Sequence, residues 1–328
     1  MKILALETSC DETSAAVVEG SRVLSNVVAS QIEMHRKWGG VVPEAAARAH
    51  VEALLPTIRE ALANAGVQPS DLEGIGVTNR PGLAGALSVG VTAAKALALA
   101  WNLPLLGVHH LEGHLSAILA VEPNPPFPFA ALIVSGGHTE LVEVTEWGRY
   151  RILGETRDDA AGEAFDKSAR LLGLGYPGGR AIQEEAKKGD PRRYPLPKGL
   201  KGDTLDFSFS GVKTAVLRLV EREGDALSIP DAAASLQEAV VAVLAERAAK
   251  AAERGGYRML ALVGGVAANQ ALRERLRATC ERKSIAFVTP PFELCTDNAG
   301  MIGLAAVWRF ARGDRDDLSL EALANAEL

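Results

Sequence analysis

KILALETSCDETSAAVVEGSRVLSNVVA, residues 2–29, is the stretch that decides the fold. Apolar residues dominate Lys2–Glu7, a polar turn follows, and alternation resumes over Ser14–Glu19 and again over Val23–Ala29. Short runs of this kind, separated by turns of Gly, Ser and Asp, are typical of antiparallel strands joined as hairpins. The stretch therefore predicts a three-stranded antiparallel meander.

A second meander with the same plan is predicted further along the chain. Strands are expected at Phe129–Ser135, Glu140–Thr145 and Tyr150–Glu155, with GGHT as the first turn. Helical patterns follow both meanders, at Pro43–Asn64 and at Gly162–Leu172. A repeated meander predicts two similar lobes with a cleft between them.

Single strands then alternate with helices, which predicts the α/β class. These strands are expected at Gly74–Thr78, Pro104–Val108, Met259–Val263 and Ser284–Thr289. The proline-rich segment Glu122–Pro128 predicts the boundary between the lobes. We expect lobes at 1–127 and 128–328, with the last helix, Ala299–Arg312, packing back on the first lobe.

The composition excludes several classes of protein. With 48% hydrophobic and 23% charged residues, a chain of 328 residues can bury a full core and does not resemble a disordered protein. A formal net charge of −6 excludes a broad basic face for nucleic acid but allows a local basic patch. Basic residues gather at Lys187, Lys188, Arg192, Arg193, Lys198 and Lys201, and again at Arg273, Arg275, Arg277, Arg282 and Lys283.

The cysteines and the first residues predict a cytoplasmic protein. Cys10, Cys280 and Cys295 are odd in number and far apart, so neither a disulfide framework nor a cysteine zinc site is expected. Glu7 follows only four apolar residues, too early for a signal peptide. Charged, polar and proline residues interrupt the apolar stretch Leu87–Val108, which predicts a buried helix rather than a membrane span.

HHLEGH, residues 109–114, is the sharpest local motif. On a helix, His110 and His114 lie one turn apart on one face, where two imidazoles can share a metal ion. A pair of surface or capping histidines is the alternative. The motif is not the HExxH of zinc peptidases, because Glu112 would lie on another side of the helix. Asp297, in CTDNAG just before an apolar helix, is either a third ligand or the N-cap of that helix.

Two glycine-rich turns follow predicted strands, in IVSGGHTE (133–140) and in LVGGVAANQALR (262–273). Bare backbone amides at such turns can approach an oxyanion or a nucleotide phosphate closely. For either turn taken alone a plain connection between elements is the favoured interpretation, and the presence of two such turns favours a ligand site. In FSFSGVKT (207–214), Ser210 is expected to cap a helix that carries Lys213 in its first turn, and one of these two residues could face an anion.

Eight blocks of sequence follow one another in the order ETSCDET, GGVVPE, HLEGH, IVSGGHTEL, GEAFDKSARLLGLGYPGG, FSFSGVKT, GGVAAN and CTDNAGMI. Together they cover most of the chain and resemble the tRNA N6-adenosine threonylcarbamoyltransferase family, TsaD, also labelled Gcp or O-sialoglycoprotein endopeptidase-like. The resemblance implies the fold shared by actin, sugar kinases and Hsp70 (ASKHA), which has two lobes, duplicated ribonuclease H-like sheets and a nucleotide cleft.

The activity implied by this resemblance is an acyl transfer to tRNA. The threonylcarbamoyl group of threonylcarbamoyl-adenylate would pass to N6 of the adenosine 3′ of the anticodon, in tRNAs that read codons starting with A, with release of AMP. The implied partners are tRNA, the TsaB paralogue and the TsaE ATPase, with no membrane. The implied cofactor is one divalent metal ion, Fe²⁺, with Zn²⁺ also compatible with the ligands.

The resemblance also assigns site residues. The metal ligands implied are His110, His114 and Asp297. The adenylate is expected to contact Ile133, Val134, Ser135, Gly136, Gly137, Asp166, Gly179 and Asn269. Gln183 stands where many members carry an acidic residue that meets the ribose, so no ribose contact is assigned to it. Asp11, in the first turn, is the candidate base that takes the proton from the adenosine amine.

Three other functions fit the same fold. A metal-dependent peptidase is disfavoured because no glutamate is placed as in HExxH. A non-catalytic scaffold of the TsaB type is disfavoured because such a paralogue is expected to lack the histidine pair. A kinase of the same fold gives no reason for His110 and His114.

Overall fold

The structure is a computed structural model that describes residues 1–200 and 202–328. Lys201, one of the clustered basic residues, lies outside the described residues. The chain divides into two compact units. Unit 1 contains Met1–Asn124 and Pro290–Leu328, and unit 2 contains Pro125–Thr289.

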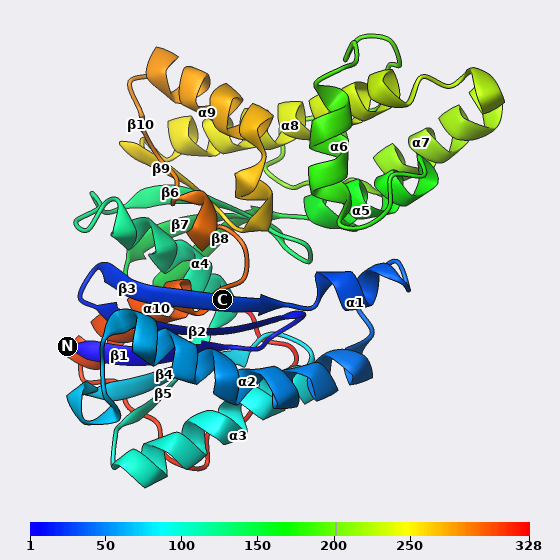
Figure 1. Cartoon of the computed structure of the whole chain (residues 1–328). Coiled ribbons are helices and arrows are strands. Elements are labelled where there is room, and N and C mark those ends of the chain that lie inside the picture. Colours follow the sequence, from blue (N-terminus) through cyan, green and yellow to red (C-terminus); the bar gives the residue numbers. More distant parts are fainter. Residues whose placement is uncertain (201) are drawn as a thin grey trace. The chain divides into compact units, whose positions relative to one another are not determined.

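Unit 1 is built on a five-stranded sheet with the order β3-β2-β1-β4-β5 (Figure 1). Its strands are β1 (Lys2–Glu7), β2 (Glu12–Glu19), β3 (Arg22–Ser30), β4 (Gly74–Arg80) and β5 (Leu105–His109). Strands β1, β2 and β3 are antiparallel neighbours, and β4 and β5 add in parallel. The meander predicted from residues 2–29 is therefore confirmed.

Helices cover both faces of this sheet. They are α1 (Ile32–Arg36), α2 (Pro43–Ala65), α3 (Ala84–Trp101), α4 (His110–Ser116) and α10 (Ala299–Ala311). Because strand side chains alternate between faces, Leu4 and Leu6 pack in the core with α2 and α3. Ala5 points to the opposite face, where a Cβ at Gly303 of α10 would lie 3.2 Å from its Cβ.

Unit 2 repeats this sheet with the order β10-β9-β6-β7-β8. Its strands are β6 (Phe129–Val134), β7 (Thr139–Glu146), β8 (Arg149–Glu155), β9 (Met259–Val263) and β10 (Ala286–Val288). Its helices are α5 (Ala161–Leu171), α6 (Gly178–Ala186), α7 (Ser210–Glu223), α8 (Ile229–Arg254) and α9 (Gln270–Arg282). Again three strands form an antiparallel meander and two more add in parallel. The predicted duplication is confirmed.

Helix α3 differs from the buried helix predicted over Leu87–Val108. It ends at Trp101, because Asn102 adopts a left-handed conformation (φ 53°), and the rest of the stretch enters β5. It is apolar and long enough to cross a membrane by length and composition, and only 33% of it is buried. Its buried side faces the sheet core, whereas its outer side carries small residues and the exposed Leu99.

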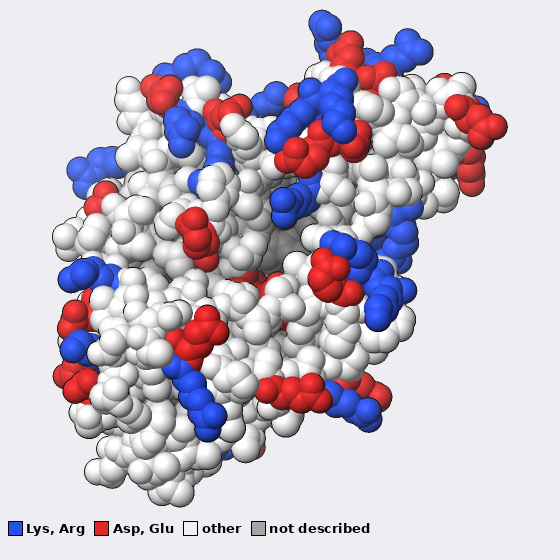
Figure 2. Space-filling model, in the orientation of Figure 1, with Lys and Arg blue, Asp and Glu red and all other residues white. Residues whose placement is uncertain are grey.

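Charges of both signs are interspersed over the face of the molecule drawn in Figure 2. Lysines and arginines lie beside aspartates and glutamates on this face, without one broad basic area. This distribution agrees with the acidic balance of the sequence, in which any basic surface for nucleic acid has to be local.

Candidate functional site

The HHLEGH motif joins β5 to α4 in unit 1. His109 ends the strand and caps the helix, its Nδ1 accepting a hydrogen bond from the backbone N–H of Leu111 at 3.2 Å. The helix then begins at His110, so His110 and His114 lie one turn apart with ring centroids 4.7 Å from each other. A Cβ at Gly113 would lie 2.6 Å from Ile302 of α10, so this glycine allows the close packing of the two helices.

Asp297 lies against both imidazoles. Its Oδ1 is 3.4 Å from Nε2 of His110 and 3.3 Å from Nε2 of His114. It does not cap α10, because Asn298 does so through a hydrogen bond from the N–H of Met301 to its Oδ1, 3.0 Å long. The alternative of Asp297 as the N-cap is therefore wrong, and its carboxylate is directed to the histidines.

A buried carboxylate, Glu7, orients His110 from the other side. Glu7 Oε2 is 3.1 Å from His110 Nδ1 and accepts a 2.6 Å hydrogen bond from the hydroxyl of Thr78. Ser9 Oγ lies 3.2 Å from the same Nδ1. A carboxylate on one imidazole nitrogen fixes the ring and leaves the other nitrogen for a metal ion. Glu7 is not among the site residues predicted from the sequence, where its one signal is an acidic residue at the end of an apolar strand.

The charges of these groups are strongly coupled. Burial opposes protonation of His110, but Asp297 and Glu7 outweigh it and raise its pKa to about 10. Burial lowers the pKa of His114, which stays neutral. Although burial opposes it, the pKa of Asp297 lies well below its ordinary value because of the two histidines. The buried carboxylate of Glu7 and the half-buried carboxylate of Asp297 thus attract positive charge to this cluster, and a divalent cation would balance them.

The cluster fits a metal ion on two further observations. One nitrogen or oxygen from each of His110, His114 and Asp297 lies within 4.8 Å of the others. His114 is fully buried; among the described residues its Nδ1 has no hydrogen-bond partner, and its Nε2 has none besides the 3.3 Å contact with Asp297 Oδ1. Since an unsatisfied buried polar group is costly, a bound ion explains this arrangement. Two imidazoles and one carboxylate suit divalent iron or zinc.

The two glycine-rich turns meet in unit 2, at the ends of the neighbouring parallel strands β6 and β9. Gly264 has a φ of 93°, and a Cβ there would lie 2.4 Å from the carbonyl oxygen of Val134, so only glycine fits. Cβ atoms built at Gly136 and Gly137 meet nothing within 4 Å. The backbone of these two glycines is therefore accessible to a bound group, as at other ligand sites beyond the carboxyl ends of parallel strands.

Ile133, Val134 and Ser135 lead into this turn. Ile133 and Val134 are fully buried in β6, and the backbone N–H of Ser135 donates to the carbonyl of His138 at 2.9 Å. Ser135 Oγ accepts a hydrogen bond from the N–H of His138 at 3.2 Å. The side chains of the first two residues thus belong to the core, and any contact they make with a ligand comes from their backbone.

The remaining predicted contact residues of unit 2 surround the starts of α6 and α9. Asp166 Oδ1 accepts a 2.7 Å hydrogen bond from the N–H of Gly178, and a Cβ at Gly179 would meet nothing within 4 Å. Asn269 caps α9 through the N–H of Leu272 at 3.0 Å. These residues thus shape two helix starts, and their contact with a ligand stays a prediction.

Gln183 connects the same two helices. Its Oε1 accepts a 2.7 Å hydrogen bond from the backbone N–H of Gln270, at the first residue of α9. The side-chain carbonyl is thus used within unit 2, which gives this position a structural role.

Asp11 lies in a turn that is held on both sides. Its carbonyl accepts a 3.1 Å hydrogen bond from the N–H of Gln31, and the carbonyl of Cys10 accepts one of 3.0 Å from His50 Nε2. His50 is fully buried, and its Nδ1 lies 2.7 Å from the hydroxyl of Thr13. The backbone that carries Asp11 is therefore fixed.

Ser210 is not the cap of α7, which corrects the prediction. The helix begins at Ser210 itself, and Asp158 supplies the capping carboxylate from a distant part of the chain. Asp158 accepts hydrogen bonds from the N–H groups of Phe209 and Ser210 and from the hydroxyls of Ser208 and Ser210. With its amides and hydroxyl directed to Asp158, this helix start is already satisfied.

A family model and curated relatives match almost the whole chain. The model described as TsaD, tRNA N6-adenosine threonylcarbamoyltransferase, matches residues 22–304. A protein of that name from Anaeromyxobacter dehalogenans is 54% identical over 326 residues, covering 98% of each chain. One from Symbiobacterium thermophilum is 54% identical over 324 residues, covering 98% of this chain and 95% of its own.

Solved structures with similar folds are remote in sequence. HypF from T. kodakarensis matches 95% of this chain and 48% of its own, with a TM-score of 0.64 and 15% identity. Component A of the (R)-2-hydroxyglutaryl-CoA dehydratase from Acidaminococcus fermentans matches 94% and 97%, with a TM-score of 0.56 and 16% identity. These likenesses confirm the expected ASKHA fold.

Proposed function

Since the chain belongs to the TsaD family, the tRNA N6-adenosine threonylcarbamoyltransferases, and is a transferase of tRNA modification, we propose that its donor is threonylcarbamoyl-adenylate. The acceptor is N6 of the adenosine 3′ of the anticodon in tRNAs reading codons that start with A. The amine attacks the carbamoyl carbon, the bond from that carbon to the phosphate oxygen breaks, and AMP leaves. The cluster of His110, His114 and Asp297 is the observation that carries this proposal.

The donor is already activated, so the protein needs to supply position and charge stabilisation rather than a strong nucleophile. Backbone amides of Gly136 and Gly137 are suited to hold the adenylate phosphate, since both glycines are open to a ligand, whereas the N–H of Ser135 already donates to the carbonyl of His138. A divalent metal ion held by the three ligands would act as a Lewis acid toward the donor oxygens. Glu7 keeps His110 oriented for that role.

Asp11 is the residue that we assign as proton acceptor for the adenosine amine. The held carbonyls of Cys10 and Asp11 support this role, because a general base has to be placed accurately. An Asp11→Asn variant should fold normally and lose most of its turnover while it still binds the donor. Full turnover in that variant would exclude the role.

Adenylate contacts are proposed for the residues at the glycine-rich turns and at the two helix starts. They are Ile133, Val134, Ser135, Gly136, Gly137, Asp166, Gly179 and Asn269. The open space above Gly136, Gly137 and Gly179 supports these contacts.

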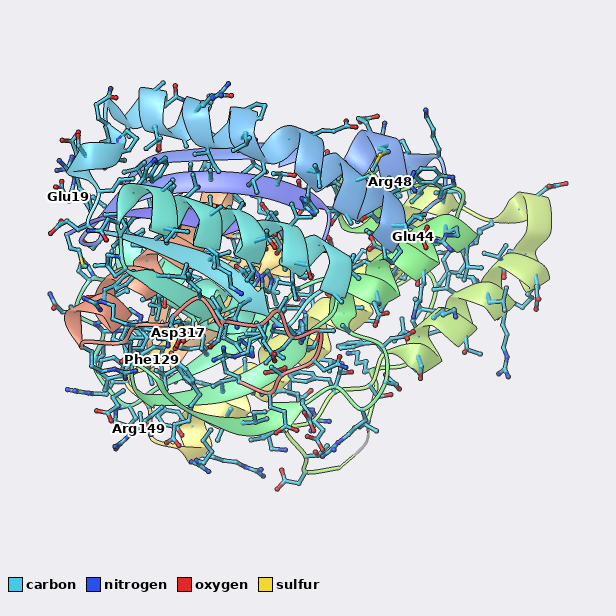
Figure 3. The ribbon with its side chains drawn as sticks, turned by 90° about the horizontal axis from the view of Figure 1, so that it is seen from below. Glu19, Glu44, Arg48, Phe129, Arg149 and Asp317 are labelled. Carbon is cyan, nitrogen blue, oxygen red and sulfur yellow. The ribbon has the colours of Figure 1, made fainter. Side chains whose placement is uncertain are left out.

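The partners that we propose are tRNA, a TsaB-type paralogue and a TsaE-type ATPase, in the cytoplasm. Exposed apolar residues on the neighbouring helices α2 and α3 support a protein partner for unit 1, namely Val51, Leu55 and Leu99. Glu44 and Arg48, labelled in Figure 3, are exposed charged residues near the start of α2, on the same helix as Val51 and Leu55. Apolar residues bordered by charges are typical of protein interfaces.

A peptidase of the HExxH type is not supported. Glu112 is buried, and its Oε2 lies 3.4 Å from Nη1 of Arg309 rather than beside the histidine pair. A glutamate paired with an arginine in this way is a poor general base, because the positive charge stabilises its ionised form.

A transfer assay tests the proposal. Purified chain, alone and with the two partner proteins, receives chemically made threonylcarbamoyl-adenylate and unmodified tRNA, and the nucleosides are identified by mass spectrometry. Modified adenosine should form and should disappear in His110→Ala. His109→Asn is the matched control, since it removes the adjacent imidazole, keeps a capping side chain and should leave product formation intact.

A further inference from the structure

A groove of about 500 Å³ lies in unit 2, apart from the residues assigned above to the adenylate. One wall is the segment Tyr194–Pro197, and the other is one side of α7. From α7 the groove is lined by Ser210, Gly211, Thr214, Ala215, Arg218, Leu219 and Arg222.

The wall opposite α7 is held in place by hydrogen bonds to α8. Tyr194 is buried, its backbone N–H donates to Ser235 Oγ, and its hydroxyl accepts from the N–H of Ser228, each at 3.2 Å. Further along, the buried guanidinium of Arg247 donates to backbone carbonyls, including that of Leu200 at 2.7 Å. The capping of α7 by Asp158 fixes the other wall. A groove with two fixed walls loses little entropy when it binds a ligand.

The groove is positively charged within an acidic protein. Arg218 and Arg222 line it, and none of the described residues that line it is acidic, although the chain has a net charge of −6. Arg218 is exposed and has no carboxylate partner among the described residues, whereas Arg222 Nε donates to Glu223 Oε1 at 2.8 Å. The exposed Arg193 and Lys198 adjoin the Tyr194–Pro197 wall in sequence. Arg218 therefore carries the least compensated charge of the groove.

The spacing and chemistry of the two arginines suit consecutive phosphates. Residues four apart on a helix have Cβ atoms about 5–6 Å from each other. Guanidinium groups match phosphate oxygens with two parallel hydrogen bonds. Gly211 and Ala215 add little bulk between the walls, so a polymer backbone can enter.

We propose that this groove binds the phosphodiester backbone of the tRNA substrate. The inference rests on the proposed function and adds to it the surface that receives the RNA. Among the described lining residues Tyr194 is the one aromatic, and it is buried and hydrogen-bonded, so these residues present no ring to stack on a base. Contacts to backbone alone predict binding that does not depend on base sequence and weakens with salt.

Charge reversal at Arg218 tests this groove. Affinity for unmodified tRNA is measured over a series of salt concentrations for wild type, Arg218→Glu, Arg218→Gln and Arg222→Glu, with and without the two partner proteins. Arg218→Glu should weaken binding by about tenfold or more, and Arg218→Gln should reduce the slope of log K against log salt by about 1. Arg222→Glu should have a smaller effect, because Glu223 already compensates that arginine.

The matched control is Arg59→Glu, which makes the same charge change at an exposed position of α2 in unit 1. It should bind tRNA like wild type in the measurements without the partner proteins, the condition that applies to this control because Arg59 lies one turn from Leu55 on the face assigned to a partner. Binding of threonylcarbamoyl-adenylate should be unchanged in every variant, because the groove is separate from the glycine-rich turns.

The outcomes separate this inference from the proposed function. If Arg218→Glu binds tRNA with the affinity of wild type, and wild type forms modified adenosine, the inference that the groove binds tRNA is wrong. The proposed function is then unaffected. An equal loss in Arg59→Glu overturns the inference as well, since only net charge would then matter. If Arg218→Glu binds tRNA normally but no longer binds a partner protein, the occupant of the groove is an acidic segment of that protein and the inference is wrong. If wild type neither binds nor modifies tRNA, both proposals fail.

Discussion

The turn between β1 and β2 and the turn between β6 and β7 occupy the same place in two sheets of the same strand order, yet they differ in chemistry. The first is polar, and Ser9 within it reaches His110 through its side chain. The second is formed by Gly136 and Gly137, which leave the backbone open. A duplicated scaffold thus presents side chains at one turn and open backbone at the other, so the two copies differ in the chemistry that they offer to a ligand.

The largest effect is expected when a side-chain metal ligand is removed from unit 1. Asp297→Ala should lose bound metal and reduce transfer by more than the roughly 10–100-fold typical of outer-shell changes. Metal content by elemental analysis and turnover with the same preparation check this result. Treatment of wild type with a chelator should give the same loss, restored by Fe²⁺ or Zn²⁺. Full metal content in Asp297→Ala would contradict the role of side chains as metal ligands in unit 1.

A smaller effect is expected from the carboxylate behind the ligand. Glu7→Gln should weaken metal affinity by about 10–100-fold, because a neutral amide orients and polarises His110 less strongly. Metal affinity is measured by competition with a coloured chelator. Thr78→Val, which removes only the hydroxyl that donates to Glu7, should shift the affinity less. An equal shift in both variants would mean that packing, not charge, orients the histidine.

In the second unit the matching test adds a single methyl group. Gly264→Ala should lower the free energy of unfolding by about 1–3 kcal/mol, since its φ of 93° and the nearby carbonyl of Val134 both exclude a Cβ. Urea denaturation measures this change. Gly265→Ala is the control, because a Cβ there meets nothing within 4 Å. Similar stabilities for the two variants would show that the turn adapts freely.

The smallest expected effect concerns pH. Burial lowers the pKa of His50 in the folded chain, whereas the unfolded chain takes up a proton near pH 6.5. The stability that neutral His50 contributes is therefore present above about pH 6.5 and is lost as the pH falls toward the lower folded pKa. His50→Gln keeps a donor for the carbonyl of Cys10 and does not titrate. Its free energy of unfolding should fall less steeply than that of wild type between pH 7 and 5, and parallel curves would exclude the effect.

Much of the fold could be predicted because its signals are local. Alternation over Lys2–Glu7 and its neighbours sets the strands, and the spacing of His110 and His114 sets a shared helical face. The features that local patterns did not predict depend on contacts between residues far apart in the sequence. Glu7 is a partner of His110 only because β1, β4 and β5 are neighbours in one sheet. The cap of α7 comes from Asp158, which no pattern around Ser210 reveals.

The hydrogen bonds at Asp158 also close a long excursion of the chain. Asp158 and Ser208 meet although 50 residues separate them, and Thr156 bridges to Phe207 just before. The part of the chain between these points contains α5, α6 and the Tyr194–Pro197 wall. It leaves the sheet after the edge strand β8 and returns to the same place. Segments whose ends meet can change length or content with little disturbance to the rest of the fold. Because α5 and α6 carry Asp166 and Gly179, the Tyr194–Pro197 wall is the part of this excursion in which evolution could most easily fit the same scaffold to a different RNA.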